Sequence, residues 1–152
     1  MASSDELTVH IERALPASRS LVFAAHTEPR QLAEWWGPKG FVAPSVDVDL
    51  RVGGSYRIAM QPPDGVLFHL SGKFLVIEPP SRLVYTFRWN EPDPDDRETV
   101  VTISLEDADD STVLTVDQGH FATEARRSLH RQGWTESLDR LQDLLSRPGP
   151  AP

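Results

Sequence analysis

The chain contains no cysteine, and this absence removes several kinds of chemistry at once. A thiol nucleophile, a thiolate metal site and a disulfide framework all need cysteine, so none of them operates here. No apolar run approaches the roughly 18 residues that suggest a membrane-spanning helix. The N-terminal residues also lack the basic segment and apolar stretch of a signal peptide. We therefore expect a cytoplasmic protein without a membrane span.

Positive charge is also scarce. The sequence has 15 Lys and Arg residues against 23 Asp and Glu residues, which gives a formal net charge of -8. Binding nucleic acid over a wide surface requires a basic patch that neutralises phosphates, so we expect no nucleic-acid partner. Much of the acidity falls in residues 91–96 and 106–110, which have the composition of solvated loops.

Catalytic and cofactor signatures are missing as well. The sequence has no GxSxG nucleophile motif, no phosphate-binding glycine loop and no dinucleotide fingerprint. The five histidines show no metal-ligand spacing such as HExxH, and the acidic segments lack the spacing of a calcium loop. We therefore expect no metal and no cofactor, and we favour a protein that is not an enzyme.

The pattern of apolar residues predicts secondary structure along most of the chain. Alternation of apolar and polar side chains predicts a strand at residues 7–15 and six more strands between residues 42 and 119. Two short helices are expected between them, the first capped by Ser18 and the second opened by Pro29. Such helices suit a connection that crosses from one edge of a sheet to the other.

The later strands are expected to form an antiparallel meander, followed by one long helix. Gly53-Gly54 predicts a two-residue hairpin turn, and Gly72 predicts a β-bulge in a long strand. The last helix is predicted at residues 124–146, with Thr123 as its N-cap and an apolar stripe along one side.

An antiparallel sheet with one apolar face needs a cover, and only the last helix is long enough to supply it. We therefore predict an α+β fold in which a curved antiparallel sheet wraps around the C-terminal helix and leaves an apolar cavity between them. Residues 1–146 are expected to form a single domain, and residues 147–152 a loose tail.

Four segments of the chain are similar to a known bacterial family. They are EWWGPKGF (34–41), DLRVGGSY (49–56), GKFLVIEPPSRLVYTF (72–87) and the leucine-rich stretch that begins with GW (133–145). The chain resembles the family named after the activator of the ninety-kilodalton heat-shock protein ATPase. That family belongs to the START-like (SRPBCC) superfamily, which includes the birch-pollen allergen and polyketide cyclases. The resemblance implies a helix-grip fold with an internal cavity. Many superfamily members bind lipids or other apolar molecules, and some catalyse cyclisation or hydrolysis.

The candidate ligand-binding residues are the aromatic and apolar side chains expected on the interior face, together with three histidines that could supply polar groups there. They are Trp36, Phe41, Tyr56, Met60, His69, Phe87, Trp89, His120, His130, Trp134 and Leu138. Core packing is the alternative role for each aromatic residue. Trp134 follows Gly133, and a glycine inside a helix costs about 1 kcal/mol relative to alanine. That cost is compensated either by a close approach of the helix to the sheet or by room for a ligand.

Three functions are consistent with this sequence. The first is the binding of a small apolar or amphipathic molecule. The second is a cyclase-like or hydrolase-like enzyme, which requires His69, His120 and His130 to converge on one pocket. The third is a protein-interaction module, acting on a chaperone or as a homodimer, which requires an exposed apolar patch. The eukaryotic co-chaperone that gives the family its name has an additional N-terminal domain, for which this chain is too short, so we do not expect a co-chaperone role.

Overall fold

A computed structural model describes residues 7–147 of the chain. Its elements follow the predicted order of one strand, two short helices, six strands and one long helix. They are β1 (Val9–Leu15), α1 (Arg19–Thr27), α2 (Pro29–Trp35), β2 (Val42–Val48), β3 (Ser55–Gln61), β4 (Phe68–Glu78), β5 (Arg82–Trp89), β6 (Thr99–Ala108), β7 (Ser111–Gly119) and α3 (Glu124–Ser146).

The seven strands form one antiparallel sheet in the order β1-β7-β6-β5-β4-β3-β2. β1 and β2 are therefore the two edge strands, and α1 and α2 carry the chain from one edge to the other, as predicted. The Ser18 hydroxyl accepts a hydrogen bond from the backbone N–H of Leu21, so Ser18 caps α1. Pro29 occupies the start of α2, where its missing N–H costs nothing.

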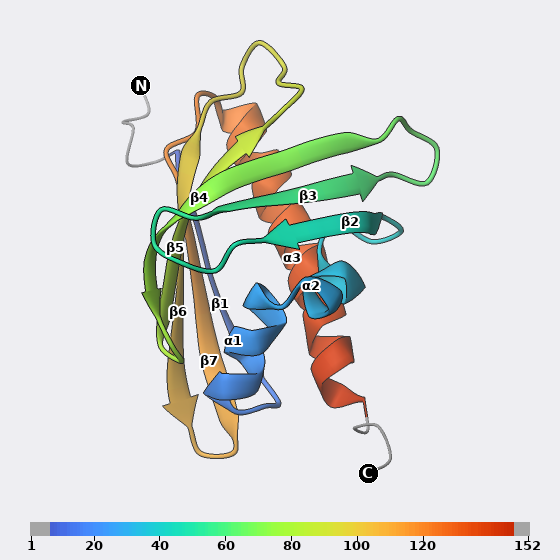
Figure 1. The fold of residues 1–152 in the computed structure, drawn as a ribbon. Helices are drawn as coiled ribbons and strands as arrows, with labels where there is room; N and C mark the ends of the chain where they lie inside the picture. The colour runs from blue at the N-terminus through green and yellow to red at the C-terminus, as the bar shows by residue number, and fades with distance from the viewer. Residues whose placement is uncertain (1–6, 148–152) are drawn as a thin grey trace.

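The long helix α3 lies along one side of the curved sheet, with α2 packed beside it (Figure 1). Its N-cap is Thr123, whose hydroxyl accepts a hydrogen bond from the Arg126 N–H. Trp134, Leu138 and Leu141 recur at helical spacing on one side of α3, and all three are buried. The predicted α+β helix-grip arrangement is thus confirmed. No helix in residues 7–147 is long and apolar enough to cross a membrane.

The predicted turn at Gly53-Gly54 is wrong in its length. β2 ends at Val48 and β3 begins at Ser55, so residues 49–54 all belong to the connection. The Gly53 N–H donates to the Phe74 carbonyl, and the Phe74 N–H donates to the Gly54 carbonyl. The two glycines are therefore bound to β4, and the chain reverses in a turn over residues 51–54, which the hydrogen bond from the Gly54 N–H to the Arg51 carbonyl closes. Gly53 has a positive φ of 84°, which explains why glycine stands there.

The predicted bulge at Gly72 is also misplaced. The register of β4 against β5 changes between Phe74 and Val76, not at the glycine. A Cβ atom at Gly72 would lie 1.9 Å from the carbonyl oxygen of Thr86, so this position requires glycine because β5 approaches closely. Of the predicted tail, residues 148–152 lie outside the described part of the chain.

Candidate functional site

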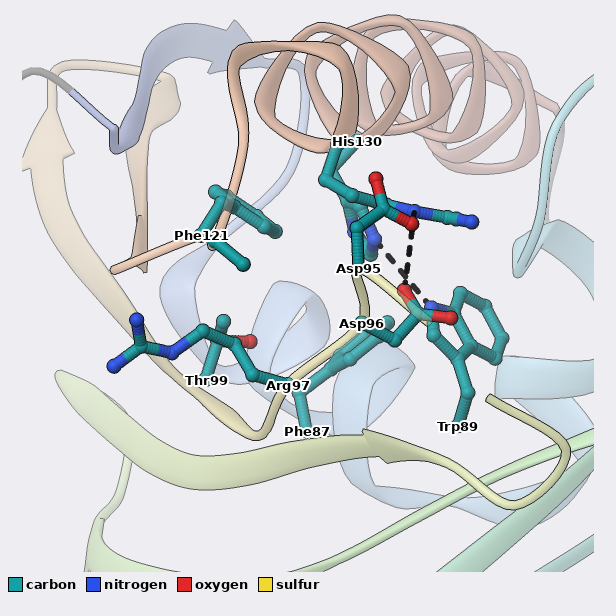
Figure 2. Close-up of a pocket in the computed structure, with 10 residues that line it drawn as sticks. Phe87, Trp89, Asp95, Asp96, Arg97, Thr99, Phe121 and His130 are labelled. Atoms are coloured by element: carbon teal, nitrogen blue, oxygen red, sulfur yellow. Dashed lines mark hydrogen bonds and ion pairs between the residues drawn. The ribbon is translucent and has the colours of Figure 1, made fainter. Parts of the chain in front are cut away.

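The first candidate site lies where the N-terminal half of α3 faces β5. Phe87 and Trp89 are two residues apart on a strand, so they share one face of the sheet. His130 extends from α3 toward these two rings, with Phe121 nearby (Figure 2). Together with the loop from β5 to β6 they enclose a cavity of about 10 Å³, which we call the outer pocket. Its lining residues are Phe87, Trp89, Asp95, Asp96, Arg97, Thr99, Phe121, Ala122, Arg126 and His130.

His130 is held among aromatic rings as a neutral side chain. Its ring centroid lies 4.7 Å from that of Phe121, 5.3 Å from that of Phe87 and 5.8 Å from that of Trp89. The Trp89 Nε1–H donates a hydrogen bond of 3.4 Å to His130 Nε2, which requires that nitrogen to carry no proton. Burial lowers the pKa of His130 to about 4, and the positive charge of Arg126 acts in the same direction.

The rim of the outer pocket is an acidic loop tied to α3 by one arginine. Arg126 Nε lies 2.9 Å from a carboxylate oxygen of Asp95 and 3.3 Å from one of Asp96. Its guanidinium also pairs with Asp93. Asp95 accepts a further hydrogen bond from the Thr123 hydroxyl, and the hydrogen bonds from Arg126 and Thr123 lower the pKa of Asp95. The loop is therefore fixed to the first turn of α3 by charge-assisted hydrogen bonds.

A row of half-buried aromatic rings continues from the outer pocket across the sheet. Phe41 contacts Phe68 with a centroid distance of 6.2 Å, and Phe68 contacts Trp89 at 5.2 Å. We call Phe41, Phe68 and Trp89 the aromatic row. All three are partly exposed, although they pack against the buried core. The row therefore joins the interior to the surface beside α3.

Gly133 leaves room on the flank of α3. A Cβ atom built at this glycine would have a single neighbour within 4 Å, the Pro38 Cγ at 4.0 Å. Of the two explanations for a glycine in this helix, close approach to the sheet is therefore ruled out. A methyl group would therefore fit beside Gly133, which itself lines neither the outer pocket nor the second cavity described below.

A second cavity lies between the short helices and the sheet. Its volume is about 20 Å³, and we call it the inner cavity. It is lined by His26, Leu32, Trp36, Val48, Tyr56, Ile58, Phe74 and Tyr85. Burial raises the pKa of Tyr85 and of Tyr56 well above the ordinary range, so both phenols stay protonated. The two cavities share no lining residue.

The three predicted histidines do not converge. His69 lies on β4 between Phe68 and Leu70, which face the core, so its own side chain points to the opposite face of the sheet. Its Nδ1 is 2.8 Å from a carboxylate oxygen of Glu91. His120 is exposed just after β7. Only His130 reaches a cavity. The convergence of His69, His120 and His130 that the enzyme hypothesis requires is therefore not found.

The remaining predicted residues divide between the cavities and the core. Phe87, Trp89 and His130 line the outer pocket, while Trp36 and Tyr56 line the inner cavity. Trp134 is buried against Trp36 and donates its indole N–H to Gln118 at 2.7 Å. Neither the outer pocket nor the inner cavity is lined by Phe41, Met60, Leu138 or Trp134.

Sequence reasoning missed His26 and Phe68. His26 follows Val22 by one helical turn in a short, largely apolar helix, which is the pattern of an ordinary core position. Phe68 was hidden by the apolar run at the start of β4, where alternation is unclear. No group of three or more His, Asp or Glu residues in 7–147 is arranged to hold a metal ion.

This combination of a curved antiparallel sheet, a long C-terminal helix and an aromatic interior defines a helix-grip protein. The family model described as "Activator of Hsp90 ATPase homolog 1-like protein" matches residues 16–146. The chain belongs to this family, as the four similar segments had predicted.

Solved structures agree with that assignment. A protein from Chromobacterium violaceum is 28% identical with a TM-score of 0.86, covering 94% of this chain and 99% of that one. One from Nitrosomonas europaea is 31% identical with a TM-score of 0.79, covering 92% and 94%. An AHSA1 protein from Silicibacter pomeroyi is 28% identical with a TM-score of 0.79, covering 91% and 97%. Among curated proteins, none matches the sequence.

Proposed function

We propose that this protein binds a small apolar or amphipathic molecule beside the N-terminal half of α3, at the outer pocket and the aromatic row. The observation that carries the proposal is Gly133. Glycine in a helix interior costs about 1 kcal/mol relative to alanine, yet no neighbour prevents a Cβ atom at this position. This room on the flank of α3 supports the second explanation that the sequence offered, space for a ligand.

The chemistry of the surrounding side chains suits an amphipathic ligand. The rings of Phe41, Phe68 and Trp89 offer apolar surface that is only partly covered. The outer pocket adds the hydroxyl of Thr99 and the charged groups of its acidic rim. An apolar body can therefore lie along the aromatic row, with a polar end at the loop. We expect the protein to bind this ligand in the cytoplasm.

The closed structure has no room for a complete ligand. The outer pocket measures about 10 Å³ and the inner cavity about 20 Å³, each close to the space of one water molecule. Binding therefore requires side chains to move. The half-buried rings of the aromatic row are the ones that can turn outward at the lowest cost, because solvent already covers one side of them.

The proposal is tested by thermal shift against fatty acids, flavonoids and polyketides. The wild type is compared with Gly133→Leu, which fills the open space, and with Gln132→Leu, which adds the same side chain on the exposed side of α3. We expect at least one compound to stabilise the wild type and the Gln132 variant saturably, and the Gly133 variant to bind at least tenfold more weakly. Equal affinities in all three proteins, or no stabilisation of the wild type, would contradict the proposal.

A further inference from the structure

A chain of buried hydrogen bonds fixes the role of the Thr99 hydroxyl on the wall of the outer pocket. The Trp134 indole N–H donates to the side-chain oxygen of Gln118 at 2.7 Å, and Gln118 Nε2–H donates to Thr99 Oγ1 at 2.9 Å. An indole N–H can only donate, so the Gln118 amide cannot be turned the other way. The Thr99 oxygen therefore accepts in this chain, and its own proton must be directed elsewhere.

The Thr99 hydroxyl proton has no acceptor within the protein. Thr99 is 2% exposed, and it stands opposite Phe87 where β5 pairs with β6. Both side chains line the outer pocket. No group in residues 7–147 accepts a hydrogen bond from this hydroxyl. An uncommitted donor is therefore left on the pocket wall.

The acceptors around the same pocket are already occupied. One carboxylate oxygen of Asp95 accepts from Arg126 and the other from Thr123. One oxygen of Asp96 lies against Arg126, and the other accepts from the backbone N–H of Asp93. The acidic rim is thus directed at α3 and at its own backbone rather than at the pocket.

Two further groups at the pocket are also donors. His130 Nε2 accepts from the Trp89 indole, so the proton of this neutral ring is on Nδ1. That Nδ1–H is hydrogen-bonded to nothing in the described part of the chain. Arg97 lines the pocket as well, and a guanidinium can only donate. The uncommitted polar groups here are therefore of one kind.

This imbalance decides which ligand group can replace water. The outer pocket, at about 10 Å³, holds about one water molecule. A water there accepts the Thr99 proton, and a ligand group that displaces it without offering an acceptor loses affinity. A carboxylate would meet the three aspartates of the rim, whereas a carbonyl brings an acceptor without a negative charge.

We propose that the polar end of the ligand is an uncharged carbonyl group, whose oxygen accepts a hydrogen bond from the Thr99 hydroxyl. This inference rests on the proposed function, because it concerns the ligand bound at the outer pocket. The apolar body of such a molecule lies along the aromatic row. Thr99 thereby favours a ketone or an ester over a hydrocarbon of the same shape.

The test compares acetophenone with α-methylstyrene, in which a CH₂ group replaces the carbonyl oxygen. Binding is followed by NMR through the indole N–H of Trp89, which donates to His130 at the pocket. The two compounds are hydrated differently in water, so the quantity compared between proteins is the ratio of their affinities. We expect the ratio of acetophenone to α-methylstyrene affinity to fall about tenfold in Thr99→Val.

Two variants serve as controls. Thr99→Ser keeps the hydroxyl, and Thr102→Val removes one from the opposite face of β6. Both should keep the wild-type affinity ratio within about twofold. An unchanged ratio in Thr99→Val would overturn the inference, and so would a wild-type protein that does not bind acetophenone.

A second measurement decides the question if Thr99→Val does not fold. The carbonyl stretching frequency of acetophenone bound to the wild type should lie below its value in hexane, because a hydrogen bond weakens the C=O bond. A frequency equal to that in hexane would overturn the inference. If both compounds shift the Trp89 signal saturably and the affinity ratio does not depend on Thr99, the proposed function stands and only the carbonyl assignment is wrong.

Discussion

At the scale of single residues, His26 and His130 are neutral near neutral pH because burial lowers the pKa of each to about 4. An unfolded chain restores the ordinary histidine pKa of 6.5. Between these values the unfolded chain binds a proton that the folded protein does not. Protonation therefore favours unfolding as the pH falls, and both histidines act in the same direction.

The first prediction concerns the pH dependence of stability. Below pH of about 6.5 the free energy of unfolding should fall, down to about pH 4, by roughly 3 kcal/mol at most for His26. The titratable groups that line the same cavity are Tyr56 and Tyr85, and both stay neutral in this range. Urea denaturation between pH 4 and 8 measures the effect. The curve for His26→Leu should be flatter than that of the wild type, and parallel curves would show that His26 is not buried in its neutral form.

The second prediction concerns Gly133. Because a Cβ atom at this position has its nearest neighbour at 4.0 Å, Gly133→Ala should relieve the helix cost without a clash. We expect the free energy of unfolding to rise by about 1 kcal/mol, measured by urea denaturation without ligand. A decrease would mean that the flank of α3 is packed more tightly than the structure shows.

At the scale of elements, the start of α3 and the acidic loop form one unit held by Arg126. Burial of Arg126 works against its charge, but the hydrogen bonds to Asp95 and Asp93 outweigh this effect and its pKa is raised. Arg127, one residue further on, pairs with Glu124 within the same helix. The two arginines can therefore be compared directly. Arg126 joins α3 to the loop between β5 and β6, whereas Arg127 pairs only within α3.

The third prediction follows from this comparison. Arg126→Gln should destabilise the protein by about 1–2 kcal/mol, because three carboxylates lose a shared charged partner. Arg127→Gln should cost no more than about 0.5 kcal/mol, as expected for an exposed helix pair. Hydrogen exchange should accelerate at residues 93–97 in the Arg126 variant alone. Similar protection of the loop in both variants would contradict the role given to Arg126.

Elements defined by local patterns were predictable from the sequence. The caps Ser18 and Thr123, the proline at the start of α2 and the stripe on α3 all depend on residues a few positions apart. The connection at residues 49–54 was not, because its form depends on hydrogen bonds to Phe74 on another strand. The sequence predicted a bulge at Gly72, but glycine is needed there because Thr86 on β5 lies close to it. A contact between two strands leaves no mark in the local sequence pattern.

The candidate site was predictable only in part for the same reason. Phe87, Trp89 and His130 were found because strand and helix periodicity placed them on inward faces. Periodicity does not show which side chains line the same cavity. The sequence therefore could not show that His130 lines a pocket while His69 and His120 do not. It also could not reveal that His26 would lack a partner for one nitrogen, since that depends on every side chain around it.

At the scale of the whole molecule, the sheet surrounds α3 on one side, and the edge strands β1 and β2 lie at its opposite ends. Aromatic rings fill much of the interior, and the aromatic row carries this packing out to partly exposed positions. The protein thus has a closed core and one set of rings that is partly exposed to solvent. Binding at the proposed site requires those rings to move aside for a ligand.

The most direct measurement is an NMR titration that follows the indole N–H resonance of Trp89, assigned with a Trp89→Phe variant. This N–H donates to His130 at the outer pocket, so a ligand there must disturb it. With at least one apolar or amphipathic compound the account predicts a saturable shift of the Trp89 signal, which is lost in Gly133→Leu. If no compound moves that signal, or if it moves equally in Gly133→Leu, the proposed binding site is wrong.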